Sequence, residues 1–468
     1  MTRALHRRLA GDESGVTMVI AVLLSGVIAI LAVTMLAVGL HTDQATARGR
    51  HFTQALHVAE SGIEEALALI EEADGVYPSG TFTGTTELGA YEVTVVRQPR
   101  NRYEITSVGG VRAGRQLGAE RSIRVVLEPP LSFDKALFSY TTVETKNNDI
   151  IEGDVWGNHN VILALGTQVH GSVIAASGYV DLGGGASVDE DAISGGFNSS
   201  LSEAVHLGAN ATVGGNVTAS VVPVACVGAD NADYKVRLDS GAVVGGNVKT
   251  WGNVQGAGTV SGTIANSVCT SALAAEELPA FTFNENNYDS VTYFGTPSTP
   301  SATAVNNFHT YVLSQAYRIS GTFYINQASP VSQATQVDLT GMTITGDTTI
   351  ISNAPIFANG VTDDTTDAIF ALIDSYDPPS ASACDVNNDK SECTIHLKNS
   401  FDVSGTTAVV VYSPYGSVAI KNNQAQFGSV YADSIQIKNN QTLTFDERIM
   451  RIAGFGEVTM EITEWVEL

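Results

Sequence analysis

The sequence predicts a mostly-β protein of the α+β class: a long amino-terminal transmembrane helix, a small antiparallel β meander and a β-solenoid (β-helix) passenger. The first observation is an uncharged apolar run over residues 16–40. The second is a set of three short runs of alternating apolar and polar residues between 91 and 127. The third is a group of imperfect Gly- and Val-rich repeats in the remainder of the chain. Together they divide the chain into a short leading segment (1–15), the helix (16–74), the meander (75–130) and the passenger (131–468).

The apolar run, VTMVIAVLLSGVIAILAVTMLAVGL, is long enough to cross a membrane. As a helix it would extend about 37 Å, whereas the hydrocarbon core of a bilayer is ~30 Å thick. Three arginines precede the run and Asp43 follows it, so the amino terminus should remain in the cytoplasm. We therefore expect a single-pass protein of the inner (cytoplasmic) membrane with its bulk outside the cytoplasm. The expected anchor residues are Val16, Ile20, Leu24, Ile28, Leu31, Met35 and Leu40.

The helix should continue beyond the membrane, because residues 45–72 contain no proline. Apolar residues recur there at steps of three and four, which predicts one apolar stripe along a helix. Gly75 is a plausible end for this helix. The expected stripe consists of Phe52, Leu56, Ala59, Ile63, Leu67 and Ile70.

The run GVTMVIAVLLSGVIAILAVTMLAVG, followed by QALHVAESGIEEALALI, resembles the amino terminus of PilX-type minor pilins of type IV pilus systems. The resemblance covers about residues 1–128. It implies a leader peptide that a prepilin peptidase removes between Gly15 and Val16. It also implies that the partners are other pilin-like subunits and the membrane. The alternative is a single-pass anchor that is never cleaved.

Two positions depart from the pilin pattern. The fifth mature residue is Ile20, where pilins that enter the pilus shaft usually carry Glu, and the first is Val16, where Phe is common. PilX-type and tip-located minor pilins often lack that glutamate. The resemblance therefore implies a role in filament initiation, at the tip, or in simple anchoring.

Three runs of period two predict the antiparallel meander: Tyr91–Arg97, Arg102–Val108 and Arg121–Leu127. Their apolar faces should cover the apolar stripe of the helix. Pro129 and Pro130 then mark a domain boundary.

Internal repeats predict the solenoid. LALGTQVHGSV, LGANATVGGNV and LDSGAVVGGNV begin at Leu163, Leu207 and Leu238 and share a V-x-G-x-V ending. KNNDIIEGDVWG near the start of the passenger is similar to KNNQAQFGSVYA near its end, and IKNNQ recurs at Ile420 and Ile437. Such repeats stack as coils about 4.8 Å apart and bury a continuous core. The Gly-(Asp/Ser/Asn)-Val turns resemble those of bactofilins and related polymer-forming proteins. A β sandwich is the alternative, and residues 274–304 and 363–393 are expected to be loop excursions.

The formal net charge of −25 argues against nucleic acid as a partner. The cysteines are Cys226, Cys269, Cys384 and Cys393. Their even number in an exported chain favours two disulfides, and proximity in sequence suggests 226–269 and 384–393. Buried unpaired thiols are the alternative.

Candidate sites are few. Asp385, Asn387 and Asp389 alternate as at the start of a calcium loop, although Lys390 stands where such loops need Gly. We therefore expect no cofactor apart from calcium at this loop, and its alternative is a solvated hairpin tip. The acidic clusters at 189–191 and at 363, 364 and 367 could be the carboxylates of a polysaccharide-active enzyme, or solvated loop charges.

No catalytic motif occurs in a credible context, so the sequence favours a structural protein over an enzyme. We expect a minor pilin-like surface subunit whose passenger acts in adhesion or at the filament tip. Its further partners would be a polysaccharide or a host or envelope surface. The alternatives are an anchored β-helix enzyme acting on polysaccharide and a plain surface adhesin unrelated to pili.

Overall fold

The computed structural model describes residues 6–72, 78–98, 102–113, 116–128, 133–196, 203–219, 235–268, 273–288, 290–328, 336–375, 393–398, 407–421, 425–438, 440–449, 455 and 461–468. The chain forms two compact units. The first unit comprises residues 1–129 and 458–468, and the second comprises residues 130–457. The second unit is therefore inserted into the sequence of the first.

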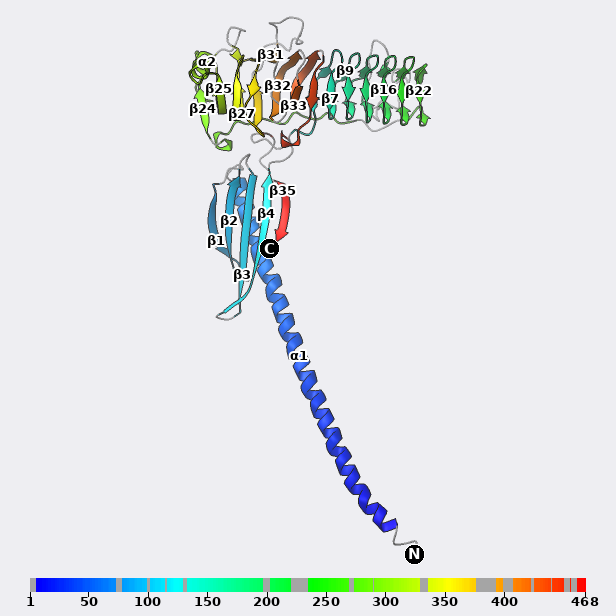
Figure 1. The fold of residues 1–468 in the computed structure, drawn as a ribbon, viewed down its shortest axis with the longest axis vertical. Helices are drawn as coiled ribbons and strands as arrows, with labels where there is room; N and C mark the ends of the chain where they lie inside the picture. The colour runs from blue at the N-terminus through cyan, green and yellow to red at the C-terminus, as the bar shows by residue number, and fades with distance from the viewer. Residues whose placement is uncertain are drawn as a thin grey trace. The chain divides into compact units, whose positions relative to one another are not determined.

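A single helix, α1 (His6–Glu72), makes up the amino-terminal part of the first unit (Figure 1). It contains no proline, and the hydroxyl groups of Ser25, Thr34 and Thr42 donate to carbonyl oxygens three or four residues earlier. The helix includes the expected apolar run and its continuation. It begins ten residues before Val16, and the expected end at Gly75 lies outside the described residues.

A five-stranded antiparallel sheet completes the first unit. The strand order is β1-β2-β3-β4-β35. The three predicted runs lie in the three central strands, and Val95, Ile105 and Val125 are partners across them. The strands are β1 (Gly80–Thr85), β2 (Ala90–Gln98), β3 (Arg102–Ala113), β4 (Gln116–Glu128) and β35 (Glu461–Glu467).

Strand β35 corrects the expected passenger boundary. Residues 131–468 were expected to belong to the passenger, but β35 pairs with β4, for example Glu461 with Glu128. The last residues of the chain therefore complete the sheet of the first unit. This pairing joins segments more than three hundred residues apart, so no local pattern in the sequence indicates it.

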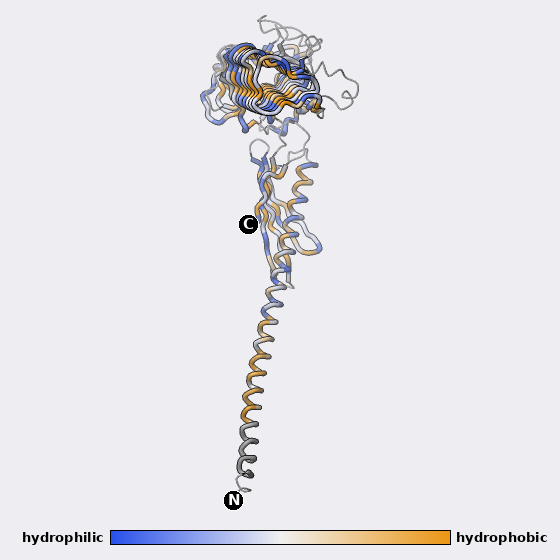
Figure 2. Tube along the Cα trace, turned by 90° about the vertical axis from the view of Figure 1, so that its right-hand side faces the viewer, coloured by the Kyte–Doolittle hydropathy of each residue, from blue (hydrophilic) through white to orange (hydrophobic). Residues whose placement is uncertain are grey.

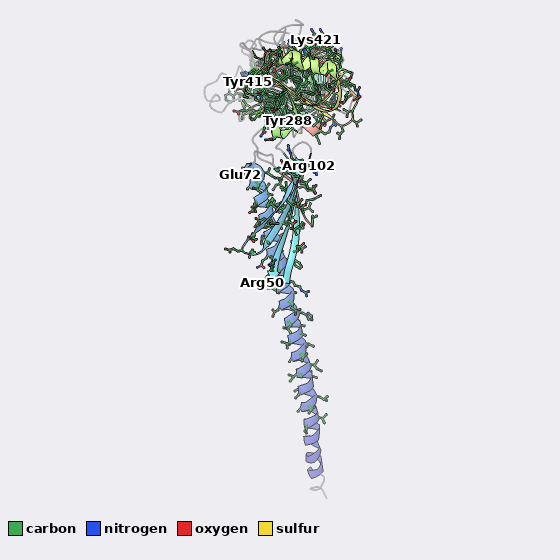
Figure 3. All side chains as sticks on the ribbon, turned by 90° about the vertical axis from the view of Figure 1, so that its left-hand side faces the viewer. Arg50, Glu72, Arg102, Tyr288, Tyr415 and Lys421 are labelled. Carbon is green, nitrogen blue, oxygen red and sulfur yellow. The ribbon has the colours of Figure 1, made fainter. Side chains whose placement is uncertain are left out.

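The second half of α1 packs on this sheet as expected, although the buried stripe is rotated. Figure 3 shows the sheet alongside the part of α1 between Arg50 and Glu72. Phe52 was expected in the stripe but is 42% exposed, and the Arg121 guanidinium lies over its ring at 4.7 Å. Small residues instead let the helix approach the strands closely. The buried hydrophobic residues of the helix are Ala55, Val58, Ala59, Ile63, Ala66 and Ile70, and Gly62 is buried as well.

The second unit is a nearly closed, largely parallel sheet of 30 strands. From β5 (Leu137–Ser139) to β23 (Ile264–Ala265), most strands pair in parallel with the third strand before and the third after. Successive turns of the chain therefore lie over one another, as Figure 2 shows end-on, and their inward residues form one buried apolar core. The strands between these two are β6 (Thr142–Glu144), β7 (Ile150–Glu152), β8 (Val155–Gly157), β9 (Asn160–Leu163), β10 (Gln168–Val169), β11 (Val173–Ala175), β12 (Val180–Leu182), β13 (Ser187–Val188), β14 (Ala192–Ser194), β15 (Glu203–Leu207), β16 (Thr212–Val213), β17 (Val217–Ala219), β18 (Lys235–Leu238), β19 (Val243–Val244), β20 (Val248–Thr250), β21 (Val254–Gly256) and β22 (Thr259–Val260).

The rest of the second unit continues the stack from its opposite end. After residue 265 the chain passes the short helix η2 (Glu285–Asn287), and α2 (Ala304–Ser314) follows β24. Further parallel strands then return toward the first turn. They are β24 (Val291–Phe294), β25 (Arg318–Ile325), β26 (Val337–Asp338), β27 (Thr343–Ser352), β28 (Ile356–Asn359), β29 (Thr362–Asp363), β30 (Ile369–Asp374), β31 (Cys393–Lys398), β32 (Ala408–Lys421), β33 (Ala425–Lys438) and β34 (Thr442–Thr444), followed by the short helix η4 (Glu447–Ile449).

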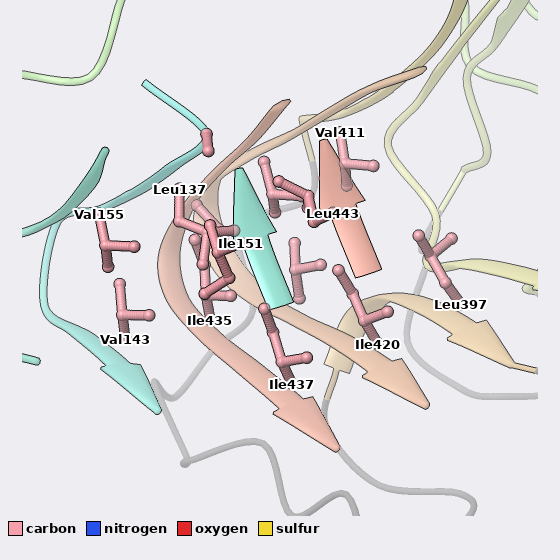
Figure 4. Close-up of a cluster of buried hydrophobic side chains, with 14 of the residues drawn as sticks. Leu137, Val143, Ile151, Val155, Leu397, Val411, Ile420, Ile435, Ile437 and Leu443 are labelled. Carbon is pink, nitrogen blue, oxygen red and sulfur yellow. The ribbon is translucent and has the colours of Figure 1, made fainter. Parts of the chain in front are cut away.

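The last turn stacks directly on the first. Strand β33 pairs with β5 and β6, and β34 pairs with β7. Figure 4 shows Leu137 and Ile151 from the first turn beside Ile435 and Leu443 from the last two strands, in one buried cluster. The chain therefore enters and leaves the second unit at neighbouring turns in the middle of the stack.

Both expected excursions contain strands of this sheet. Residues 274–304 include β24, which pairs with β25, and residues 363–393 include β30. Every residue of β30 is buried, and the strand pairs with β27 and β32. The apolar run at 369–373 is thus a core strand, because it is covered on both faces.

Candidate functional site

The apolar part of α1 is the most distinctive surface among the described residues. From Met18 onward, α1 contains a segment long and apolar enough to cross a membrane, and none of that segment is buried within the protein. Gly15 and Val16 lie within α1, whose side chains are described from Met18 on. This helix could serve as a single membrane span or as a signal anchor. The remaining expected anchor residues are between 51% and 73% exposed: Ile20, Leu24, Ile28, Leu31, Met35 and Leu40.

The polar side chains of the apolar segment have partners inside the helix. Ser25 Oγ donates to the carbonyl oxygen of Ala21 at 2.7 Å, and Thr34 Oγ1 lies 3.0 Å from that of Ile30. A hydroxyl that is satisfied in this way can enter a hydrocarbon environment without an unpaired donor. The segment is therefore suited to lipid or to other apolar helices along its whole length.

The acidic cluster at 189–191 is divided among three separate interactions. Asp189 Oδ2 lies 2.7 Å from His170 Nδ1, and Glu190 accepts from the Ser172 hydroxyl at 2.9 Å. Asp191 Oδ1 accepts from the backbone and side-chain nitrogens of Asn216. The three carboxylates thus bind three different neighbours in adjacent turns and form no shared site.

The second acidic cluster is divided in the same way. Asp364 pairs with Arg318, and Asp367 Oδ1 accepts from Arg448 Nη1 at 2.6 Å. Asp363 is the last residue of β29, which pairs with β27. The pair Asp364–Arg318 spans the strand β27 that lies between them, and the pair Asp367–Arg448 joins the segment before β30 to η4. These contacts favour a structural role for Asp364 and Asp367.

His206 bridges two other turns through its ring nitrogens, a contact that no motif in the sequence predicts. Its Nδ1 lies 2.8 Å from Asp181 and its Nε2 lies 3.2 Å from Asp239. The hydrogen bond to Asp181 raises the pKa of His206, and burial opposes this only in part. Asp181 on β12 is the strand partner of His206 on β15, whereas Asp239 follows the end of β18, two residues after Arg237, the partner of His206 on the other side. Only the spacing of the turns, 25 and 33 residues here, could have indicated it.

Lys135 is the centre of a second group of contacts that no motif in the sequence predicts. Its Nζ lies 2.9 Å from Asp134 and 2.7 Å from Glu276, and 5.3 Å from the centre of the Trp156 ring. Burial acts to lower the pKa of Lys135, but hydrogen bonds to Glu276 and Asp134 outweigh it, so the pKa is raised. This cation fastens the segment around Glu276 to the outside of the first turns.

The expected calcium loop and disulfides fall largely outside the described residues. Asp385, Asn387 and Asp389 lie there, as do Cys226, Cys269 and Cys384. Cys393 begins β31, and its side chain is not described. Among the residues whose positions are described, no group of three or more His, Cys, Asp or Glu side chains could hold a metal ion.

No protein-family model matches the chain, and no curated protein matches it. One solved structure with some similarity is that of an ice binding protein from an Antarctic bacterium, Flavobacteriaceae. The identity is 12%, the match covers 68% of this chain and 99% of the other, and the TM-score is 0.12. A similarity this weak supports no argument about fold or function.

Proposed function

We propose that this protein is a membrane-anchored, minor pilin-like subunit of a type IV pilus or a related assembly. One observation carries the proposal: a single helix is apolar and exposed in its first part and packs on an antiparallel sheet in its second part. The first part would be held in the membrane, or among similar helices in a thin filament. The resemblance of residues 1–128 to PilX-type minor pilins supports the same assignment.

The second unit would be the passenger that this anchor carries. We interpret its stacked parallel turns as a β-solenoid, and the in-register columns of apolar residues support this interpretation. Arg3, Arg7 and Arg8 before the apolar segment favour a cytoplasmic amino terminus, so the passenger would lie outside the cytoplasm. There its surface would serve in adhesion or at the filament tip, toward a polysaccharide or a host or envelope surface.

Ile20 supports placement at the tip or in initiation. This position would be the fifth of the mature chain, and its side chain is apolar and 58% exposed. A shaft subunit would carry a glutamate there. A subunit without this glutamate would pack its apolar helix against the helices of other subunits but would offer them no carboxylate.

The test is to block processing at Gly15 and follow both the leader and the assembly. In the native host, Gly15→Leu should abolish removal of the leader and recovery of the protein with other pilin-like subunits. Gly26→Leu is the matched control, because no atom lies within 4 Å of the position that its Cβ would occupy. The control should be processed and recovered like the unaltered protein.

The other candidate functions predict different results. A plain adhesin or an anchored polysaccharide-active enzyme would keep residues 1–15, and Gly15→Leu would change nothing. The described acids at 189–191 are engaged in contacts between turns, which gives the enzyme less support.

A further inference from the structure

The two ends of the parallel stack differ. At one end α2 covers the interior, with Ala304, Val305, Phe308 and Val312 buried in the same core as the strands. At the other end the last turn consists of β21, β22 and β23, and no described element lies beyond it (Figure 1). One end is thus capped by a helix and the other ends in a bare turn.

The last turn exposes positions that every earlier turn buries. Ala192, Val217 and Val248 occupy one column of paired positions and are fully buried, whereas Ile264, the next residue in this column, is 50% exposed. In two other columns Val254 and Val260 are only partly buried, although Val236 and Val244 beneath them are fully buried. The apolar core is therefore partly exposed at the end formed by β21, β22 and β23, where no further described turn covers it.

The backbone of the last turn is also open on one side. Within the described chain, β21, β22 and β23 pair only with β18, β19 and β20. Thr259 N and Ser261 N donate to the carbonyl oxygens of Ala242 and Val244, so the amide of Val260, between them, points to the opposite edge of β22, away from β19. This edge can accept a further strand.

The composition of the last turn is unusual for an exposed edge. Residues 252–268, GNVQGAGTVSGTIANSV, contain no charged residue and no proline. Proteins normally protect such edges with charges or proline, because an open edge pairs with other chains. The preceding turn carries Lys235, Arg237, Asp239 and Lys249, so the absence of charge is confined to the final turn.

We propose that this open end is a docking surface for the open end of a second copy of the same chain. Two copies related by a twofold axis would each present the same uncharged edge, and the exposed Ile264 side chains would enter a shared core. The chain carries a net charge of −25, so an uncharged surface is where two copies can approach with the least repulsion. Because α2 covers the opposite end, the product is a pair and not a filament.

Site-specific photo-crosslinking in the full-length, membrane-bound protein tests this proposal. A photoreactive benzoyl-phenylalanine at Thr259 should yield a product of twice the monomer mass, with linked peptides from two copies. Thr212 is the matched control, since Thr212, Val243 and Thr259 form one column and both threonines are exposed. The probe at Thr212 should give at least tenfold less of that product.

A charge at the edge provides an independent measurement. Thr259→Asp should reduce the dimer fraction of the detergent-solubilised full chain at least tenfold in analytical ultracentrifugation, and Thr212→Asp should leave it unchanged. The proposal is overturned if the Thr259 probe links within one copy, links to a different protein, or reacts no more than the Thr212 probe. A dimer that persists in Thr259→Asp also overturns it, because that dimer would be held by α1.

Discussion

Gly109 shows how a single residue sets the distance between α1 and the sheet. A Cβ at this position would collide with the backbone nitrogen of Ala59 and the carbonyl oxygen of Ala55. Both contacts are backbone atoms of the helix, which cannot rotate away as a side chain could. The glycine therefore allows the helix to pack directly on β3.

Gly109→Val should destabilise the first unit by about 1–3 kcal/mol, because the added atoms force the helix away from the strand. Gly80→Val is the control, since nothing lies within 4 Å of the position of its Cβ. Chemical unfolding followed by the emission of Trp465, which lies on β35, measures the difference in a chain whose Trp156 and Trp251 are replaced by Phe. Equal stabilities of the two variants would contradict the close packing.

Asp149 ties the first turn of the parallel unit to the last. Its Oδ1 accepts from the backbone nitrogen of Gln441 at 2.9 Å, and its Oδ2 from that of Lys146 at 3.2 Å. The residue is fully buried, and burial raises the pKa of its carboxyl group from 3.8 to about 6, although the two backbone donors oppose the rise.

A raised pKa in an acid means that the folded state holds its proton over a range where the unfolded state has lost it. The contribution of Asp149 to stability therefore falls as pH rises from about 4 to about 6. We expect the free energy of unfolding to fall over this range by on the order of 1–3 kcal/mol relative to Asp149→Asn. Chemical unfolding of both proteins at several pH values measures this, and a difference independent of pH would contradict the account.

For single residues, the sequence shows which side chains can form ion pairs or hydrogen bonds, but not which residues they contact. The acids at 189–191 are adjacent in the sequence but bind separate partners, and these partners, such as His170 and Asn216, come from turns of different lengths. The register between stacked turns decides which side chains meet. Because the loops differ in length, this register cannot be read from the spacing of residues in the sequence. For the same reason the contacts of Lys135 and His206 could not be predicted.

A ladder of polar side chains links successive turns at one corner of the parallel unit. Asn216 Oδ1 accepts from the backbone nitrogen of Asn247 at 3.0 Å and from its side chain at 3.2 Å, while Asn216 itself donates to Asp191. Thr263 donates to Asn247 in the next turn. Each step satisfies a backbone amide at the bend between two strands.

Asn216→Ala should destabilise the second unit by about 1–3 kcal/mol, because it leaves the backbone amide of Asn247 without its acceptor and removes the side-chain donor to Asp191. Asn306→Ala, at an exposed position of α2, should change stability by less than about 0.5 kcal/mol. Thermal unfolding of both variants measures the two changes in stability. Equal changes would mean that the ladder does not contribute to the stability of the second unit.

The repeats in the sequence correspond to paired positions in the structure. Ile420 and Ile437, from the two copies of IKNNQ, are partners in parallel strands. Leu163, Leu207 and Leu238 lie in one column, with Leu182 of an unrecognised turn between the first two. That turn, LGGGASVDEDA, lacks the V-x-G-x-V ending, which explains the long offset in the sequence.

The similarity between the two ends of the passenger has a structural counterpart. Asn440 N donates to the carbonyl oxygen of Asn147, and Lys421 pairs with Lys438. The described residues of the KNN segments therefore lie in consecutive turns. The similarity of the KNN segments reflects the stacking of the last turn on the first. The similarity alone does not reveal the order in which the turns stack.

At the scale of the whole molecule, one unit is inserted between neighbouring strands of the other. The chain leaves the first unit after Glu128 and returns at Glu461, its partner in the sheet. In the second unit, Phe133 and Phe455 pack with ring centres 4.7 Å apart, so entry and exit are also adjacent there. Insertion at such a point disturbs neither core.

The insertion predicts that the first unit folds without the second. Replacing residues 129–460 by a two-residue Asn-Gly turn should leave β4 and β35 paired as a hairpin. Circular dichroism and cooperative thermal unfolding of the membrane-anchored product would measure this. A version that ends at residue 128 and so lacks β35 is the control and should unfold at a lower temperature. Equal melting temperatures would contradict the role of β35.

The mass of the mature amino terminus in the native host tests the central claim most directly. If α1 is a pilin-like helix, intact-mass and peptide measurements will show a chain that begins at Val16. A chain that still begins at Met1 or Thr2 would contradict that account and leave α1 as an uncleaved anchor.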